Sequence, residues 1–223
     1  MSRISRPFAA LSAAVLALAL VPAGPAAASA PPSSTTLTLS TTESAYGQSV
    51  TASAQVVTAG GQPDGDVYFA VDGRDIKANL LGNGTASVVL SGLLVGTHAV
   101  SATYVPSGGQ SGSASSPAGL VVAPARSYLQ VQVVGRRTRV PTTARLRVDG
   151  DYGTRPTGRV RVDLRRAGAG RVARVGVRLD STGAAVARLG RLRAGGYRVE
   201  VTYVGDSQHR RTRAVQRFRV PRG

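Results

Sequence analysis

The chain has no cysteine and no tryptophan, and it has only two histidines, His98 and His209, among its 223 residues. Without cysteine it cannot form disulfides, thiolate metal sites, cysteine nucleophiles or redox motifs. One histidine in each half of the chain cannot build a histidine-rich metal site. The fold must therefore be held by packing alone, which two domains of about 90 residues each can provide.

Long apolar runs are also scarce, and the one that exists lies near the start. Phe8 to Val21 is apolar, follows Arg3 and Arg6, and precedes the small residues 26–30. This order is typical of a secretory signal peptide, and the run is shorter than the roughly 20 residues that a membrane-spanning helix needs. The sequence predicts a signal peptide over residues 1–28 and an exported protein, with cleavage after Ala30 or an uncleaved anchor as the alternatives.

Beyond a short Pro/Ser spacer at residues 29–34, the chain shows period-two alternation and no helical period. Apolar residues alternate with polar ones in short runs, and Gly or Pro clusters separate the runs, as is typical of β-strands. Clear examples are residues 50–56, 67–71, 86–90 and 98–104. The fold class predicted is all-β, with antiparallel strands.

The strand pattern occurs twice along the chain. Residues 63–67 correspond to 156–160, and Tyr104-Val105 corresponds to Tyr203-Val204. The second copy is longer, and the extra residues fall near Arg165 to Arg174, where we expect a longer hairpin or loop. The repeat divides the chain into a first domain over residues 35–122, a short and stiff linker over 123–126, and a second domain over 127–221.

About seven short strands per copy favour two tandem β-sandwiches over barrels. In the second copy Leu192, Gly195 and Tyr197 match a tyrosine corner, in which a Tyr at the start of a strand bonds to the chain upstream. The first copy has His98 at this position, and the sequence leaves open whether the bond is kept.

The chain resembles bacterial immunoglobulin-like repeats of secreted and surface proteins, especially those of actinobacteria. The resemblance is carried by Gly84-x-Ala86-x-Val88-x-Leu90 and Leu93-x-x-Gly96-Thr97-His98 through Tyr104, and in the second copy by Gly183-x-Ala185 and Gly195-Gly196-Tyr197 through Asp206. It implies two immunoglobulin-like sandwiches that serve as extracellular modules for adhesion, spacing or carbohydrate contact, without catalysis and without a cofactor.

Two patterns invite a chemical interpretation that the sequence does not favour. Ser207 and His209 follow Asp206, but neighbours at a strand end point apart, and a nucleophile elbow needs a helix that is absent here. Asp64, Asp66, Asp72 and Asp75 could bind calcium, but they flank a strand and are better explained as turn residues. Asn83-Gly84-Thr85 matches a glycosylation sequon and also a hairpin turn, and the turn is preferred. We therefore predict no catalytic residues and no metal site.

Charge is divided unequally between the two copies. Residues 29–125 carry a formal charge of −3, whereas residues 126–223 carry 24 arginines and six acids, for a charge of +18. Guanidinium groups suit phosphate and carboxylate, so the second domain is a candidate for contact with polyanions.

Strand alternation predicts where these arginines lie. With the apolar residues of strands 159–164, 197–203 and 217–220 facing the core, the arginines between them face solvent. If the three strands share one sheet, they bring one set of arginines to one face, while Arg145, Arg147 and Arg188 lie on the opposite outer face. The predicted polyanion-binding residues are Arg159, Arg161, Arg198, Arg217 and Arg219.

Two functional hypotheses follow. In the first, the protein is a secreted or cell-surface binding module whose second domain contacts anionic cell-wall polymer, a phospholipid surface or extracellular nucleic acid. In the second, it is a purely structural extracellular spacer with no such partner. Sequence-specific DNA reading is not expected, because export and the absence of a recognition helix argue against it.

Overall fold

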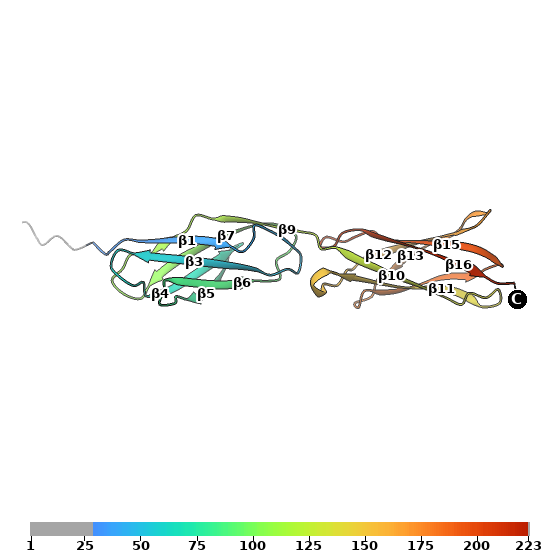
Figure 1. Cartoon of the computed structure of the whole chain (residues 1–223), viewed down its shortest axis with the longest axis horizontal. Coiled ribbons are helices and arrows are strands. Elements are labelled where there is room, and N and C mark those ends of the chain that lie inside the picture. The colour runs from blue at the N-terminus through green and yellow to red at the C-terminus, as the bar shows by residue number, and fades with distance from the viewer. Residues whose placement is uncertain (1–28, 223) are drawn as a thin grey trace, which may run out of the picture.

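The computed structural model describes residues 29–222, so the predicted signal peptide over residues 1–28 lies outside the described residues. The described chain is all-β apart from one short 3₁₀ turn, Asp151–Gly153, which confirms the predicted fold class. It forms two elongated sandwiches placed end to end (Figure 1). None of the helices found within 29–222 has the length and apolar character needed to cross a membrane.

The first sandwich contains nine strands in two sheets. One sheet has the order β1-β3-β6 and the other has the order β2-β9-β7-β4-β5, with the short β8 paired to β7. All pairings are antiparallel except that of β2 with β9. The strands are β1 (Ser33–Leu39), β2 (Glu43–Ala45), β3 (Val50–Thr58), β4 (Gly65–Val71), β5 (Arg74–Asn79), β6 (Thr85–Leu90), β7 (Gly96–Pro106), β8 (Ser113–Ala114) and β9 (Ala118–Ala123).

The second sandwich contains seven strands in the same order as the first, without counterparts of β2 and β8. Its sheets have the orders β10-β11-β14 and β13-β12-β15-β16. The strands that alternation indicated as carrying the arginines, β12, β15 and β16, therefore share one sheet. The strands are β10 (Ser127–Val134), β11 (Pro141–Gly150), β12 (Arg159–Arg166), β13 (Gly170–Arg178), β14 (Ala184–Arg191), β15 (Gly195–Tyr203) and β16 (Thr212–Val220).

Each sandwich has its own core, built from the inward residues of both sheets. Phe69, Tyr104 and Leu120 are fully buried in the first core, and Leu164, Val201 and Tyr203 are fully buried in the second. Burying such side chains stabilises the fold by about 1.5–3 kcal/mol each, which is how sheets without disulfides can be held together.

The structure differs from the sequence expectations at the start of the first domain. Strand β1 begins at Ser33, inside the predicted spacer, because Ser33 and Ser34 pair with β3. The serine-rich segment 107–116 contains β8, and the Ser113 hydroxyl bonds to Ser33 and Thr35. Of the longer hairpin or loop expected in the second copy, the structure has the longer hairpin: β12–β13 spans Arg159–Arg178, whereas β4–β5 spans Gly65–Asn79.

The linker between the domains is ordered. Ala125 is fully buried, its amide donates to the Gln208 carbonyl at 2.9 Å, and its carbonyl accepts from the Arg210 amide at 2.8 Å. The Gln208 side chain also accepts a bond from the Val95 amide of the first domain at 2.8 Å. The ring of Tyr46 packs edge-on against His209, with ring centroids 5.4 Å apart. These contacts fasten the end of one sandwich to the other.

Candidate functional site

The predicted arginines lie on the outer surface of the sheet β13-β12-β15-β16, which we call the arginine face. Along each strand the buried residues alternate with exposed ones, so every second side chain points to solvent. All five predicted residues are exposed there: Arg159, Arg161, Arg198, Arg217 and Arg219.

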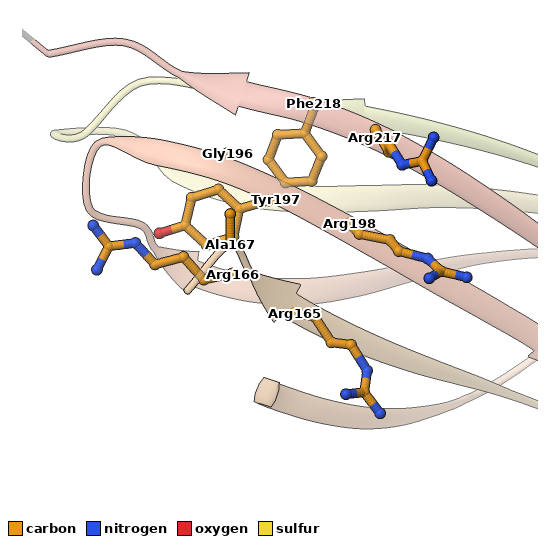
Figure 2. A pocket seen from close by; sticks show the side chains of 8 residues that line it. All are labelled: Arg165, Arg166, Ala167, Gly196, Tyr197, Arg198, Arg217 and Phe218. Atoms are coloured by element: carbon orange, nitrogen blue, oxygen red, sulfur yellow. The ribbon is translucent and has the colours of Figure 1, made fainter. Parts of the chain in front are cut away.

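Strand register aligns four arginines across this face. Arg165 on β12 lies opposite Arg198 on β15, and Arg198 lies opposite Arg217 on β16. On the other side Arg165 lies opposite Arg171 of β13, next to a β-bulge. Figure 2 shows Arg165, Arg198 and Arg217 following one another across three strands with their side chains extending in the same direction. We call these four residues the arginine rung.

Sequence reasoning missed Arg165 and Arg171. The predicted strand ends at residue 164, and the sequence leaves open a longer hairpin or a loop near Arg165; in the structure the hairpin continues through this position as paired strands. The signal was present, because the alternation that places Arg159, Arg161 and Asp163 on β12 continues to Arg165.

Two acids neutralise the middle of the arginine face. Asp163 is only 8% exposed and lies 2.7 Å from Arg174, 3.3 Å from Arg161 and 3.5 Å from Arg171. The hydrogen bond from Arg174 lowers the pKa of Asp163, against the opposing effect of burial. Glu200 lies 2.6 Å from Arg213 and 3.8 Å from Arg198.

Within the described chain, only two of the four rung residues have an acid nearby, Arg171 beside Asp163 and Arg198 beside Glu200. Among residues 29–222, no carboxylate lies within 4.0 Å of Arg165 or Arg217, and none lies within that distance of Arg159 or Arg219. Beside the rung is an open hollow of about 530 Å³ (Figure 2). It is lined by the rung residues Arg165, Arg198 and Arg217 together with Arg166, Ala167, Gly196, Tyr197 and Phe218.

The other predicted arginines, Arg145, Arg147 and Arg188, lie on the opposite sheet. Strands β11 and β14 present them to solvent, and Arg147 bonds to Asp149 at 2.9 Å. These three residues carry the same formal charge as any three arginines of the arginine face but lie on the other side of the sandwich. Substituting them is therefore a matched control for substitutions on the arginine face.

Both copies contain a corner bond at the start of the strand that follows the Leu-x-x-Gly turn. The Tyr197 hydroxyl donates to the Arg193 carbonyl at 2.8 Å, with Leu192 buried beneath it and Gly195 at φ +151°. In the first copy His98 Nε2 bonds to the Leu94 carbonyl at 2.8 Å, so histidine keeps the contact across the same four-residue separation.

His98 makes a second bond that a tyrosine could not make. Its Nδ1 lies 2.5 Å from Asp72, which sits at φ +49° in the two-residue turn between β4 and β5. Burial opposes charge on the ring, but the bonds to Asp72 and to the Leu94 carbonyl raise the pKa of His98 above its usual 6.5.

The Asp206–His209 segment forms part of the joint between the domains. His209 Nδ1 bonds to Asp206 at 2.8 Å and Nε2 bonds to Thr154 at 3.0 Å, so neither ring nitrogen is directed at Ser207. Burial works against ionisation of Asp206, but bonds from the Thr157 amide, the Gln208 amide and His209 lower its pKa to about 2. This role could not be read from the sequence, because the contacts cross to residues far along the chain.

The aspartates considered above as calcium ligands interact with different side chains. Asp66 forms an ion pair with Lys77 at 2.7 Å, and Asp72 bonds to His98. Asn83 also behaves as a turn residue, because its side-chain oxygen accepts a bond from the Thr85 amide and Gly84 lies at φ +79°. Within the described range 29–222, no cluster of three or more His, Asp or Glu has metal-binding geometry.

The strand orders define two antiparallel sandwiches of immunoglobulin type, each with a three-stranded sheet packed on a larger one. The family model for the bacterial Ig-like domain (group 3) matches residues 37–123, which make up most of the first sandwich. The resemblance to bacterial immunoglobulin-like repeats is thereby confirmed. The second sandwich has the corresponding strand order and the corresponding corner bond.

Solved structures with a similar architecture include the adhesin InvE of Yersinia pseudotuberculosis, at 15% identity and a TM-score of 0.40, over 82% of this chain and 58% of that one. The chain therefore spans less than two thirds of that adhesin structure. Fibronectin(III)-like modules of CbhA from Clostridium thermocellum match at 14% identity and a TM-score of 0.32, over 83% and 94% of the two chains. A 1.5-MDa bacterial ice-binding adhesin matches at 16% identity and a TM-score of 0.32, over 84% and 64%.

These structural likenesses add nothing to the fold assignment, which rests on strand order and on the family match. No curated protein sequence matches the chain.

Proposed function

We propose that this protein is an extracellular Ig-like binding module whose second domain holds it to anionic polymers. The supporting observation is the division of charge, −3 over residues 29–125 against +18 over residues 126–223. In this proposal the strongly basic second domain binds the polymer, and the first domain, which has a low charge, acts as a spacer that projects from it.

The mechanism is electrostatic and needs no cofactor. Guanidinium groups form charge-assisted, often bidentate hydrogen bonds to phosphate and carboxylate. A polyanion that binds several of them releases its condensed counterions, so its affinity falls linearly with salt on a logarithmic scale. The candidate partners are anionic cell-wall polymer, a phospholipid surface and extracellular nucleic acid. Because residues 29–222 contain no recognition helix, binding to nucleic acid should not depend on sequence.

The test compares the two outer faces of the second domain. We expect the chain from Ser29 onward to bind heparin, duplex DNA or purified wall polymer at low salt, and to release it toward physiological ionic strength. The triple variant Arg159→Gln, Arg217→Gln, Arg219→Gln should weaken binding more than Arg145→Gln, Arg147→Gln, Arg188→Gln. Equal losses would show that net charge matters and the arginine face does not. No binding to any polyanion would favour a purely structural spacer.

Export is part of this proposal and has its own test. Mass spectrometry of culture supernatant should find a chain that begins at Ser29, or at Pro31 if cleavage follows Ala30. Recovery of the intact chain with Met1 in a membrane fraction would contradict it.

A further inference from the structure

We infer that the arginine rung and the hollow beside it form a binding subsite for phosphodiester polymers with small polyol linkers. The rung would take the phosphates, and the hollow would take the carbon linker between them. This inference rests on the proposed polyanion function and makes it specific to one end of the arginine face.

The rung is unfavourable as the protein stands, which indicates a ligand. Like charges directly opposite each other on neighbouring strands destabilise a sheet, and the rung contains Arg171-Arg165, Arg165-Arg198 and Arg198-Arg217 in sequence. Asp163 lies 3.5 Å from Arg171 and Glu200 lies 3.8 Å from Arg198, but both acids are shared with arginines outside the rung, and neither lies within 4.0 Å of Arg165 or Arg217. An anion bound along the rung would supply the missing charge.

The hollow exists because the next outward row lacks large side chains at its centre. Gly196 has no side chain, and a Cβ built there would lie 3.8 Å from the Cβ of Ala167. Ala167 is joined to this row by its amide, which donates to the Gly196 carbonyl at 2.9 Å. Space is therefore left beside the side-chain stems of the three arginines, next to a lining that includes Tyr197 and Phe218, and the guanidinium groups extend from there along the sheet (Figure 2).

The geometry of the rung favours phosphate over carboxylate. Neighbouring strands are about 4.8 Å apart, so one anion between two strands is approached by guanidinium groups from two sides. The oxygens of a phosphate are arranged tetrahedrally and can meet both, whereas the two coplanar oxygens of a carboxylate match a single guanidinium fork.

The hollow favours a small linker over a nucleobase. Single-stranded nucleic acids are held by aromatic rings on which the bases stack. Here Tyr197 and Phe218 are only 5% and 7% exposed, and their rings stack on each other 5.5 Å apart. They offer no free ring face, but they leave room beside the phosphates for a short chain of carbons.

Calorimetry with poly(glycerol phosphate) as the probe tests the rung. The variant Arg165→Gln, Arg198→Gln, Arg217→Gln should bind at least about tenfold more weakly than the unmodified chain and lose about 2 from the salt slope, since each phosphate contact on a single chain contributes about 0.7. The comparison variant is Arg159→Gln, Arg161→Gln, Arg213→Gln, which removes the same charge from the same sheet away from the rung. It should also weaken binding, as a general loss of positive charge, but clearly less than the rung variant does. Melting curves establish that both variants are folded.

A charge-neutral variant tests the hollow. Gly196→Val adds a side chain where only the Ala167 Cβ lies near, at 3.8 Å, and where the backbone does not require glycine. It should weaken poly(glycerol phosphate) several-fold and leave inorganic polyphosphate, which has no carbon linker, unchanged.

Each other result has a distinct meaning. Equal losses from the two triple variants, or no effect of Gly196→Val, would overturn the subsite while leaving the arginine face as a general polyanion contact. Tighter binding of poly(dT) or polygalacturonate than of poly(glycerol phosphate) would overturn the ligand class. Failure of the unmodified chain to bind any of these polymers would overturn the proposed function as well.

Discussion

At the scale of single residues, the hydroxyl of Tyr197 illustrates how one bond fixes the start of a strand. It donates to the Arg193 carbonyl at 2.8 Å from a buried position. Tyr197→Phe should therefore lower the free energy of unfolding by about 1 kcal/mol, the usual net value of such a bond. Chemical denaturation measures this change.

Tyr203→Phe is the matched control for that substitution. Tyr203 lies on the same strand and is fully buried. Its hydroxyl makes no hydrogen bond of normal geometry within the described part of the chain, although burial and the nearby Asp206 raise its pKa. Removing that hydroxyl should leave stability unchanged or raise it slightly. Equal losses from both substitutions would show that the corner bond contributes nothing of its own.

His98 makes the stability of the first domain depend on pH, whereas the second domain has Tyr197 at the equivalent position. A pKa raised in the folded state means that the charged ring stabilises the fold fully below its unfolded pKa of 6.5, and that this contribution is lost as pH rises through the folded value. Hydrogen exchange in β7 should therefore become faster relative to the intrinsic rate as pH rises above 6.5.

The substitution His98→Tyr should remove this dependence, because tyrosine can keep the bond to the Leu94 carbonyl as Tyr197 does to Arg193. The NMR titration of His98 measures the pKa directly. A value at or below 6.5 would contradict the stabilising role of its contact with Asp72.

The like charges of the arginine rung predict a gain in stability when one is removed. Arg165 lies opposite Arg198 and Arg171 and has no carboxylate within 4.0 Å among the described residues. Arg165→Thr, which places a good strand former there, should raise the unfolding free energy by about 0.5 kcal/mol at low salt. Denaturation at low and high salt tests this, since the gain should shrink when salt screens the repulsion. A loss of stability would mean that the guanidinium makes a useful contact.

At the scale of elements, the sequence predicted which side chains of each strand point into the core, but it did not predict the contacts between the two domains. Alternation alone placed Val160, Val162 and Leu164 inward and their neighbours outward, because side chains on a strand point to opposite faces. The extension of β12 to Arg166 was missed, since the length of a hairpin depends on pairing that one strand does not reveal.

The turn Gly205–His209 shows why the joint escaped prediction. Its sequence indicates only a turn, but Gln208 and His209 make contacts with Val95 and Tyr46 that require the two sandwiches to be placed end to end. Such contacts between residues far apart in sequence depend on the assembled fold. Local pattern carries no information about them.

Asp206 organises this turn and should govern the acid stability of the second domain. Its folded pKa of about 2 lies below the usual 3.8, so its contribution is present above pH 3.8 and is lost as pH falls toward 2. Allowing for solvent screening, this contribution is on the order of 1–2 kcal/mol. Asp206→Asn should lower stability at neutral pH by that amount and flatten the acid limb of the pH profile.

Asp149→Asn serves as the control, because Asp149 forms an exposed ion pair with Arg147, and such pairs contribute little. Urea unfolding between about pH 2 and pH 7 follows both variants. If Asp206→Asn and Asp149→Asn have the same profile, the bonds gathered on Asp206 do not stabilise the turn.

At the scale of the whole molecule, the confinement of charge to one end predicts that the two sandwiches respond differently to salt. The second domain carries +18 and the first carries −3, and self-repulsion destabilises a compact state of high net charge. Added sodium chloride should therefore slow hydrogen exchange in β15 and β16 and have little effect in β4 and β7. At 0.1 M salt the screening length is about 10 Å, short enough to weaken repulsion across the basic domain.

The identity of the anion separates screening from binding. Chloride and phosphate at equal ionic strength screen equally, so any additional protection by phosphate reports occupancy of a site that prefers it. We expect phosphate to protect the second domain from hydrogen exchange more than chloride does. The variant Arg165→Gln, Arg198→Gln, Arg217→Gln should lose this additional protection. The variant Arg145→Gln, Arg147→Gln, Arg188→Gln should keep it. If chloride and phosphate protect the second domain equally, its charge acts only as a diffuse field. If both sandwiches respond to salt alike, the division of charge has no consequence for stability.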